Sequence, residues 1–219
     1  MSKQFWGVIL VIVLLFVGIF ALSGNKSDSS SSSKSSSKTL TNHTTGAGTT
    51  GVKLVEYGDF QCPYCEQYSS TVDNVVQEYG DKITFQFRNF PLTSLHQNAF
   101  AAARAAEAAA LQDKYWEMHS TLYQASNWQD WTPAKDPTAL FDTYAQQLGL
   151  NVDQFKKDFA SSKVNDLINA DLAEGTRLGI TGTPSFFVDG KKVTINNDPA
   201  AFKKVIDAAI AKKAPKSGS

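Results

Sequence analysis

The chain has 219 residues, and its 21 basic and 21 acidic side chains give a formal net charge of zero. A nucleic-acid-binding surface usually appears as a basic excess, so this balance argues against that class of function. The hydrophobic fraction of 42% is ordinary for a globular protein, but the apolar residues are unevenly distributed along the chain.

The N-terminus consists of a short flank, residues 1–4, and an uncharged apolar run of 18 residues, FWGVILVIVLLFVGIFAL, at 5–22. This length is close to the minimum for a membrane-spanning helix and exceeds the apolar core of a cleaved signal peptide. The small residues at 21–23 would also suit a cleavage site, so a removed signal stays open. We expect a retained transmembrane anchor, and therefore a single-pass protein of the cell membrane.

A Ser/Thr/Gly-rich tract follows at 23–51 and contains almost no apolar side chains. Such a composition cannot bury enough surface to offset the entropy of ordering, so the tract is predicted to be a flexible linker. The folded domain is predicted to span 52–212, followed by a flexible tail at 213–219. About 160 residues suit a single domain.

The domain is predicted to begin with a strand, a helix and a second strand. Residues 52–60 alternate and are rich in β-formers, and residues 83–90 alternate again. Between them, apolar residues recur at helical spacing from Tyr64 until Gly80 ends the pattern. A strand, helix and strand within 40 residues predict a βαβ unit with a parallel strand pair.

A helical block is predicted at about 92–178. Its first helix is Ala-rich and strongly helix-favouring, with Arg104 and Glu107 expected on its solvent-exposed face. Five helices are expected in the block, at 95–111, 113–125, 140–148, 152–161 and 164–172.

The strand pattern returns at 185–195, where Asp189-Gly190 separates two short apolar runs and predicts a hairpin. A last helix is expected after Pro199. The order β-α-β, helical block, β-β-α predicts an α/β core that carries a helical insertion.

Cys62 and Cys65 are the only cysteines, and they lie where the first strand gives way to the first helix. Pro63 suits the first turn of a helix, because its missing N–H would have no partner there. Cys62 would then occupy the N-cap, where free amides and the helix dipole stabilise a thiolate. Cys65 lies one turn later and could attack a mixed disulfide at Cys62, so the pair predicts a nucleophile and a resolving thiol.

The cysteine pair has two other interpretations, a structural disulfide and half of a zinc site. A structural disulfide across two intervening residues would close a very small loop and stabilise the fold little. A zinc site would need two further ligands, and the candidates are His43 in the linker and the widely spaced His96 and His119. His96 could instead flank the active-site groove, cap a helix or lie on the surface. We expect a redox pair, with no metal and no cofactor.

With VEYGDFQCPYC at 55–65 and GITGTPSFFVDG at 179–190, the chain resembles the DsbA-like branch of the thioredoxin superfamily, which comprises extracytoplasmic thiol–disulfide oxidoreductases. The resemblance covers most of 52–212. It implies a thioredoxin-like fold with a helical insertion, and a catalytic domain on the extracytoplasmic side of the membrane.

The resemblance also implies roles for individual residues. Thr183-Pro184 should form a cis peptide bond beside the cysteines and bind an extended substrate segment, as in strand addition. Glu56 should be a buried acid that exchanges protons with the resolving thiol, and burial would raise its pKa as that role requires. Pro63 and Tyr64, between the two cysteines, should tune the redox potential.

These features predict a dithiol oxidase that introduces disulfides into unfolded or reduced exported proteins and is regenerated by a quinone-linked membrane oxidase. Two alternatives stay open: a disulfide reductase or isomerase of the same fold, and a thioredoxin-fold chaperone or binding module whose dithiol is incidental. The client proteins are not specified by the sequence.

Overall fold

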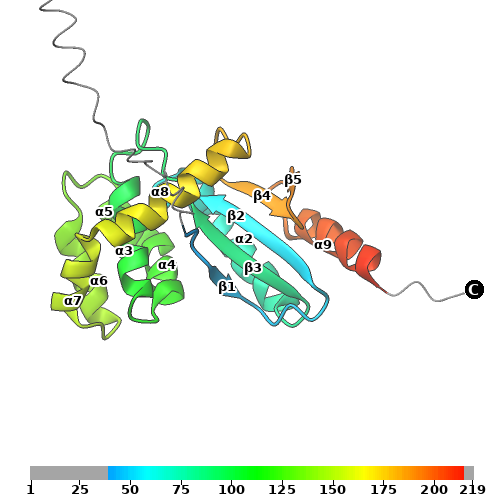
Figure 1. The fold of residues 1–219 in the computed structure, drawn as a ribbon, viewed down its shortest axis with the longest axis horizontal. Coiled ribbons are helices and arrows are strands. Elements are labelled where there is room, and N and C mark those ends of the chain that lie inside the picture. The colour runs from blue at the N-terminus through cyan, green and yellow to red at the C-terminus, as the bar shows by residue number, and fades with distance from the viewer. Residues whose placement is uncertain (1–38, 215–219) are drawn as a thin grey trace, which may run out of the picture. The chain divides into compact units, whose positions relative to one another are not determined.

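A five-stranded sheet with the order β1-β3-β2-β4-β5 organises the computed structural model, which describes residues 39–214 (Figure 1). Strands β2 and β3 run parallel, and every other neighbouring pair is antiparallel. The strands are β1 (His43–Thr45), β2 (Val52–Gly58), β3 (Ile83–Asn89), β4 (Ser185–Val188) and β5 (Lys191–Val193).

Helix α2 (Pro63–Tyr79) connects β2 to β3, which confirms the predicted βαβ unit and its parallel pair. The predicted hairpin is also present. Asp189 and Gly190 both have positive φ, 49° and 78°, and they join β4 to β5 in the two-residue turn that such a pair favours.

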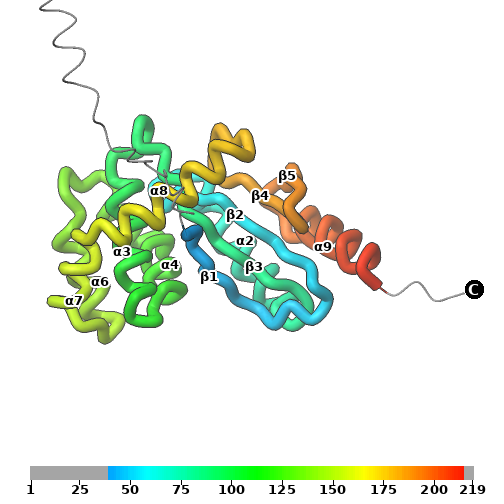
Figure 2. The backbone as a smooth tube through the Cα atoms, viewed as in Figure 1, coloured from blue at the N-terminus to red at the C-terminus, as the bar shows by residue number. Residues whose placement is uncertain are grey.

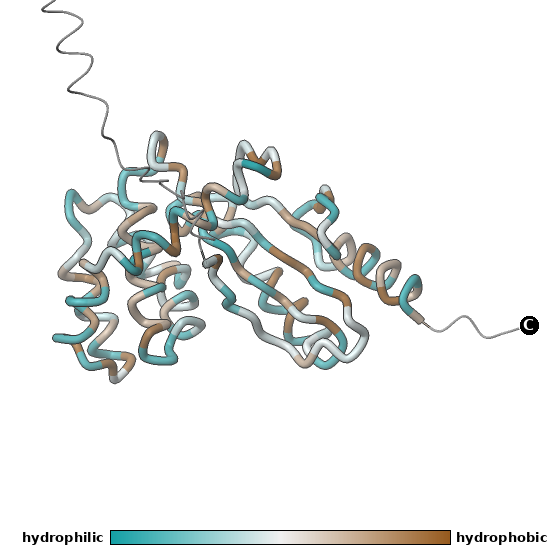
Figure 3. The backbone as a smooth tube through the Cα atoms, viewed as in Figure 1, coloured by the Kyte–Doolittle hydropathy of each residue, from teal (hydrophilic) through white to brown (hydrophobic). Residues whose placement is uncertain are grey.

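Helices α2 and α9 (Pro199–Lys213) contact each other and the sheet, and they bury an apolar core between them and the strands. Figure 3 shows apolar residues recurring along the central strands and along α9. Val52, Leu54, Ile83 and Phe87 are fully buried on β2 and β3, as expected for inner strands that are covered on both faces.

Six helices fill the segment between β3 and β4, and Figure 2 follows their path. The Ala-rich helix α3 contacts four of the other five, because its small side chains let neighbouring helices approach closely. The six are α3 (Ala99–Ala110), α4 (Tyr115–Tyr123), α5 (Ala125–Trp131), α6 (Thr138–Gln147), α7 (Val152–Phe159) and α8 (Ser162–Arg177).

The α/β fold with a helical insertion is therefore confirmed, with one helix more than the sequence predicted. Helix α5 was missed because its seven residues, ASNWQDW, are too few to show an apolar period. Its indole rings attach it to the core instead. Trp131 is fully buried and donates to the carbonyl of Leu122 at 3.0 Å.

The predicted linker at 23–51 is wrong over its second half. Residues 43–45 form the edge strand β1, which pairs antiparallel with β3. Thr41 is buried, and both its backbone N–H and its hydroxyl donate to the carboxylate of Asp171 on α8. Long-range polar contacts order this segment, and a composition that is poor in apolar residues does not reveal them.

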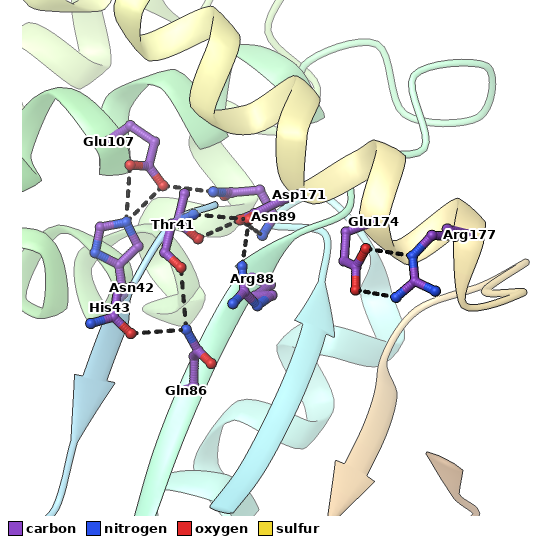
Figure 4. A network of polar contacts seen from close by, with 10 residues as sticks. All are labelled: Thr41, Asn42, His43, Gln86, Arg88, Asn89, Glu107, Asp171, Glu174 and Arg177. Carbon is purple, nitrogen blue, oxygen red and sulfur yellow. Dashed lines mark hydrogen bonds and ion pairs between the residues drawn. The ribbon is translucent and has the colours of Figure 1, made fainter. Parts of the chain in front are cut away.

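The exposed position predicted for Glu107 is also wrong, since the residue is 1% exposed. Its carboxylate accepts from the side-chain amide of Asn89 at 2.6 Å and contacts Nε2 of His43 at 2.8 Å (Figure 4). The His43 ring also stacks on Tyr115 with a centroid separation of 3.5 Å. Glu107 thus faces the segment that the sequence assigned to the linker.

The expected location as a single-pass membrane protein, with its catalytic domain outside, needs correction. Within residues 39–214, no helix combines the length and the hydropathy needed to cross a bilayer. The flank at 1–4, the apolar run at 5–22 and the tail from 215 onward lie outside the described residues.

We expect Asp171→Ala to destabilise the fold by about 2–4 kcal/mol, because it leaves the partly buried Arg88 guanidinium and the buried groups around it without their carboxylate partner. Asp171 accepts from Arg88 at 2.9 Å and from the N–H of Asn89 at 3.1 Å, in addition to Thr41. Urea unfolding measures the loss, and amide hydrogen exchange should show faster opening of 41–45.

Glu174→Ala is the matched control, because Glu174 lies one turn further along α8 and pairs with the exposed Arg177 (Figure 4). Its expected cost is below about 1 kcal/mol. Equal losses in the two variants would contradict the importance assigned to the buried network.

Candidate functional site

Cys62 occupies the N-cap of α2, and Pro63 follows in the first turn, as the sequence predicted. The backbone of Cys62 is extended, with φ −73° and ψ 122°, which points the residue across the open end of the helix. The side chain is 4% exposed, so little of the thiol surface reaches solvent. A thiolate in this position is held by helix amides and the helix dipole rather than by a cation.

These surroundings lower the pKa of Cys62 to about 5. The largest cause is a hydrogen bond from the Cys65 thiol, which outweighs the opposing effect of burial. The Thr183 side chain and the backbone amides of Tyr64 and Cys65 also lower this pKa. At neutral pH, Cys62 in the reduced protein is therefore a thiolate.

Cys65 has the opposite environment. It is 1% exposed, and burial raises its pKa well above the usual range, helped by the Cys62 thiol and by the charge of Glu56. Both cysteines are free thiols in this structure. The pair thus combines an ionised sulfur at the N-cap with a protonated sulfur one turn deeper, which is the division expected of a nucleophile and a resolving thiol.

Glu56 lies in the middle of β2, between Phe87 of β3 and Phe186 of β4, and is 4% exposed. Burial, followed by the charges of Asp73 and Cys62, raises the pKa of its carboxyl to about 8. The group is therefore protonated at neutral pH, and its pKa is close enough to neutrality for it to give up or take a proton.

The Thr183–Pro184 peptide bond, expected to be cis, is cis. It brings Thr183 against the active site, with the carbonyl oxygen 3.3 Å from the Cys62 sulfur. The Thr183 hydroxyl is a buried side-chain oxygen that has no partner among the described residues, apart from the thiolate it faces.

A groove of about 300 Å³ begins beside the cis bond and extends toward β5. Tyr64, which is 64% exposed, forms part of its wall, so this residue between the cysteines faces the groove rather than the core. The hydroxyl of Tyr68 donates to the carbonyl of Ile195 at 3.0 Å and ties the loop after β5 to α2. Other lining residues include Thr183, Pro184, Phe186, Lys192 and Val193.

Sequence reasoning missed Asp59, which is 1% exposed directly before the active-site turn. Its backbone N–H donates to the Cys65 sulfur at 3.5 Å, and its carboxylate contacts Nδ1 of His96 at 2.7 Å. His96 therefore reaches the active site through Asp59. An acidic residue between an apolar strand and the cysteines was the available signal, but its partners come from elsewhere in the chain.

The helical insertion contacts the same turn. The indole of Trp128 donates to the carbonyl of Phe60 at 2.9 Å. Gln61 connects to two insertion segments, accepting from the N–H of Asn98 at 2.6 Å and donating to the carbonyl of Thr132 at 2.8 Å. The three residues before Cys62 are thus all held by groups from the insertion.

Two of the three histidines that are candidate metal ligands have carboxylate partners instead. His43 contacts Glu107, and His96 contacts Asp59. His119 is packed among the rings of Phe60, Phe87 and other aromatic residues, and burial lowers its pKa to about 3. Within residues 39–214, no cluster of three or more His, Cys, Asp or Glu side chains is arranged to hold a metal ion.

The low pKa of Cys62 predicts a pH-dependent stability of the reduced protein. The folded thiol ionises at about 5 and the unfolded one near 9, so ionisation stabilises the reduced fold. This contribution is complete above the unfolded value and is lost as pH falls through the folded value. The unfolding free energy of the reduced protein minus that of the oxidised protein should therefore rise from pH 5 to pH 9, as measured by urea unfolding.

Reduced Cys62→Ala serves as the control and should lack this rise. Alkylation of reduced protein by iodoacetamide gives an independent measurement, with an expected midpoint near pH 5. A midpoint above pH 8 would contradict the thiolate assignment.

Glu56→Gln is expected to stabilise the oxidised protein at high pH. The folded carboxyl has a pKa of about 8 against an ordinary value of 4.5, so its burial costs stability increasingly as pH rises between these values. Glutamine has no proton to lose. The variant should match the wild type at pH 4 and exceed it by roughly 3–5 kcal/mol at pH 9 in urea unfolding.

Oxidised protein is used so that no thiol titrates in this experiment. Glu78→Gln on the exposed face of α2 is the control, and a surface change of this kind should shift stability by less than about 0.5 kcal/mol. A pH-independent effect of Glu56→Gln would show that the wild-type carboxyl is ionised throughout.

Comparison with known proteins places this geometry in a family. A thioredoxin family model matches residues 38–208. The Na(+)/H(+) antiporter NhaA 1 of Mycolicibacterium gilvum is 34% identical over 169 residues, which are 76% of this chain and 26% of that protein. The chain thus spans about a quarter of the antiporters it matches. The probable disulfide bond formation protein D of Bacillus anthracis is 29% identical over 210 residues, covering 92% of this chain and 93% of that protein.

Solved structures show the same fold. A thioredoxin-like oxidoreductase from Silicibacter pomeroyi superposes with a TM-score of 0.66 at 28% identity, over 79% of this chain and 93% of that chain. Wolbachia pipientis α-DsbA1 gives a TM-score of 0.66 at 23% identity, over 78% of this chain and 92% of that chain. The family model's match, residues 38–208, begins within the segment that the sequence assigned to the linker and ends in α9. The chain therefore belongs to the thioredoxin family, with the DsbA-like arrangement of a helical insertion between the two parts of the sheet.

Proposed function

We propose that the protein is a thiol–disulfide oxidoreductase that forms disulfide bonds in exported proteins through Cys62 and Cys65. The observation that carries this proposal is the pair of opposed thiol environments, with the pKa of Cys62 lowered to about 5 and that of Cys65 raised by burial. A stabilised Cys62 thiolate favours the reduced state, because a disulfide carries no charge to stabilise. The oxidised enzyme is then a strong acceptor of electrons.

In the proposed reaction, a substrate thiolate attacks the Cys62 sulfur of the oxidised pair, and Cys65 leaves as a thiolate. A second substrate thiolate then attacks the substrate sulfur of the mixed disulfide and expels Cys62. The substrate gains a disulfide, and the enzyme gains two electrons. Glu56, protonated at neutral pH, supplies a proton to Cys65 as it leaves.

The groove beside Thr183 and Pro184 is the proposed binding site for the substrate segment. Its wall combines aromatic rings with exposed polar groups, and the Thr183 carbonyl lies against the attacked sulfur. Unfolded or reduced exported proteins are the proposed substrates, consistent with the name of the similar disulfide bond formation protein. A quinone-linked membrane oxidase is the proposed partner that removes the two electrons.

The reduction potential of the Cys62–Cys65 pair tests the direction of the reaction. The protein is equilibrated with defined ratios of reduced and oxidised glutathione, and the thiol state is read by alkylation and mass spectrometry. We expect a potential close to that of DsbA, about −120 mV. A value close to that of thioredoxin, about −270 mV, would instead support a reductase.

A trapping experiment separates an enzyme from a binding module. Cys65→Ala lacks the resolving thiol, so its reduced form should accumulate a mixed disulfide when it is mixed with a disulfide-containing peptide. Cys62→Ala is the control and should form none, because burial raises the pKa of Cys65 and keeps its thiol protonated. Peptide binding without any covalent adduct in Cys65→Ala would favour a chaperone or adaptor of the same fold.

A further inference from the structure

Asp59 contacts both cysteines through its backbone. Its N–H donates to the Cys65 sulfur at 3.5 Å, and its carbonyl accepts from the N–H of Cys62 at 3.0 Å. The same carbonyl accepts from the Tyr123 hydroxyl at 3.3 Å. The orientation of this one peptide segment therefore decides whether an amide points at the buried sulfur.

The side chain of Asp59 holds that segment in place. One carboxylate oxygen accepts from the N–H of Gln61 at 2.8 Å, which closes the turn locally. The other accepts from the N–H of Leu92 at 2.8 Å and contacts Nδ1 of His96 at 2.7 Å. Leu92 and His96 belong to the segment between β3 and α3, so the carboxylate ties the active-site turn to the entrance of the helical insertion.

Cys65 needs such an amide, because the proposed reaction forms a thiolate at a buried site. Burial is the largest influence on this sulfur, and it opposes ionisation of Cys65. Among the groups that act on this sulfur, the N–H of Asp59 is the one that favours the thiolate. A leaving thiolate that is better stabilised leaves faster.

We propose that Asp59, held in orientation by His96, is a positioning residue that keeps its amide directed at Cys65 and thereby speeds the step in which Cys65 leaves. In that step the bond between the substrate sulfur and Cys62 forms, the Cys62–Cys65 bond breaks, and the electron pair of the broken bond stays on Cys65. This inference rests on the proposed function, since it concerns a step of that reaction.

The test measures the first step alone. Oxidised protein is mixed with a peptide that carries a single cysteine, and mixed-disulfide formation is followed by acid quenching and mass spectrometry. Asp59→Ala should slow this step about three- to tenfold, the effect of losing one ordinary hydrogen bond, because the amide lies 3.5 Å from the sulfur. His96→Ala should slow it less. His96→Asn should remain near the wild type, because its amide can donate to the same carboxylate oxygen.

A second readout separates positioning from general loosening of the site. The alkylation rate of Cys62 in the reduced protein should stay unchanged in all three variants, because Asp59 and His96 are not among the groups that shift the pKa of Cys62. Gln61→Ala, which removes the contacts to Asn98 and Thr132 in the same turn but keeps the contacts of the Asp59 carboxylate, is the matched control and should slow the first step less than Asp59→Ala does.

Three results would overturn the inference: a wild-type rate for Asp59→Ala, an equal loss in Gln61→Ala, or a parallel fall in Cys62 alkylation. If Asp59→Ala does not fold, the comparison of His96→Ala with His96→Asn decides the question. Failure of the oxidised wild type to form any mixed disulfide would count against the proposed function itself, and so differs from each of these results.

Discussion

The Cys62 thiolate must be stabilised in a nearly closed site without a neighbouring cation, and the other features of this active site depend on that requirement. Cys62 is 4% exposed, and its sulfur is surrounded by hydrogen-bond donors rather than by a Lys or Arg side chain. A fixed set of amides and hydroxyls can stabilise an anion there only if each donor is directed at it. The first turn of α2, which includes the Cys65 thiol, and the Thr183 side chain supply these donors from two separate parts of the chain.

The same constraint explains why neighbouring groups are kept neutral. Cys65 and Glu56 both lie beside the Cys62 thiolate, and for both of them burial is the largest cause of a raised pKa. A second anion beside the Cys62 sulfur would oppose the first, so in the reduced protein at neutral pH Cys62 is ionised while Cys65 and Glu56 are protonated. In the oxidised protein Cys65 has no proton of its own, so the Glu56 proton is the one available to the Cys65 thiolate as it leaves.

The helical insertion and the N-terminal segment give the active-site turn its rigidity. Trp128 holds the carbonyl of Phe60, and His96 holds the carboxylate of Asp59, so the insertion reaches the residues before Cys62 directly. Asp171 of α8 accepts from both Thr41 and Arg88, and so connects the segment before β1 to the end of β3. These contacts link elements that are distant in sequence, and the directed donors of the site depend on their alignment.

The sequence by itself determined most of the helices and strands, though not α5 or β1, and the chemistry of the cysteine pair. Helical and alternating periods, the Asp189-Gly190 turn and the placement of Pro63 after Cys62 are local features, so they could be read without knowing the fold. The tertiary structure alone decided that residues 41–45 belong to the fold, that Glu107 is buried and that Asp59 reaches Cys65. Each of these depends on a polar contact whose partner lies 6 to 130 residues away. A polar side chain looks the same in sequence whether it meets water or a buried partner, because only the folded chain brings that partner within hydrogen-bond distance.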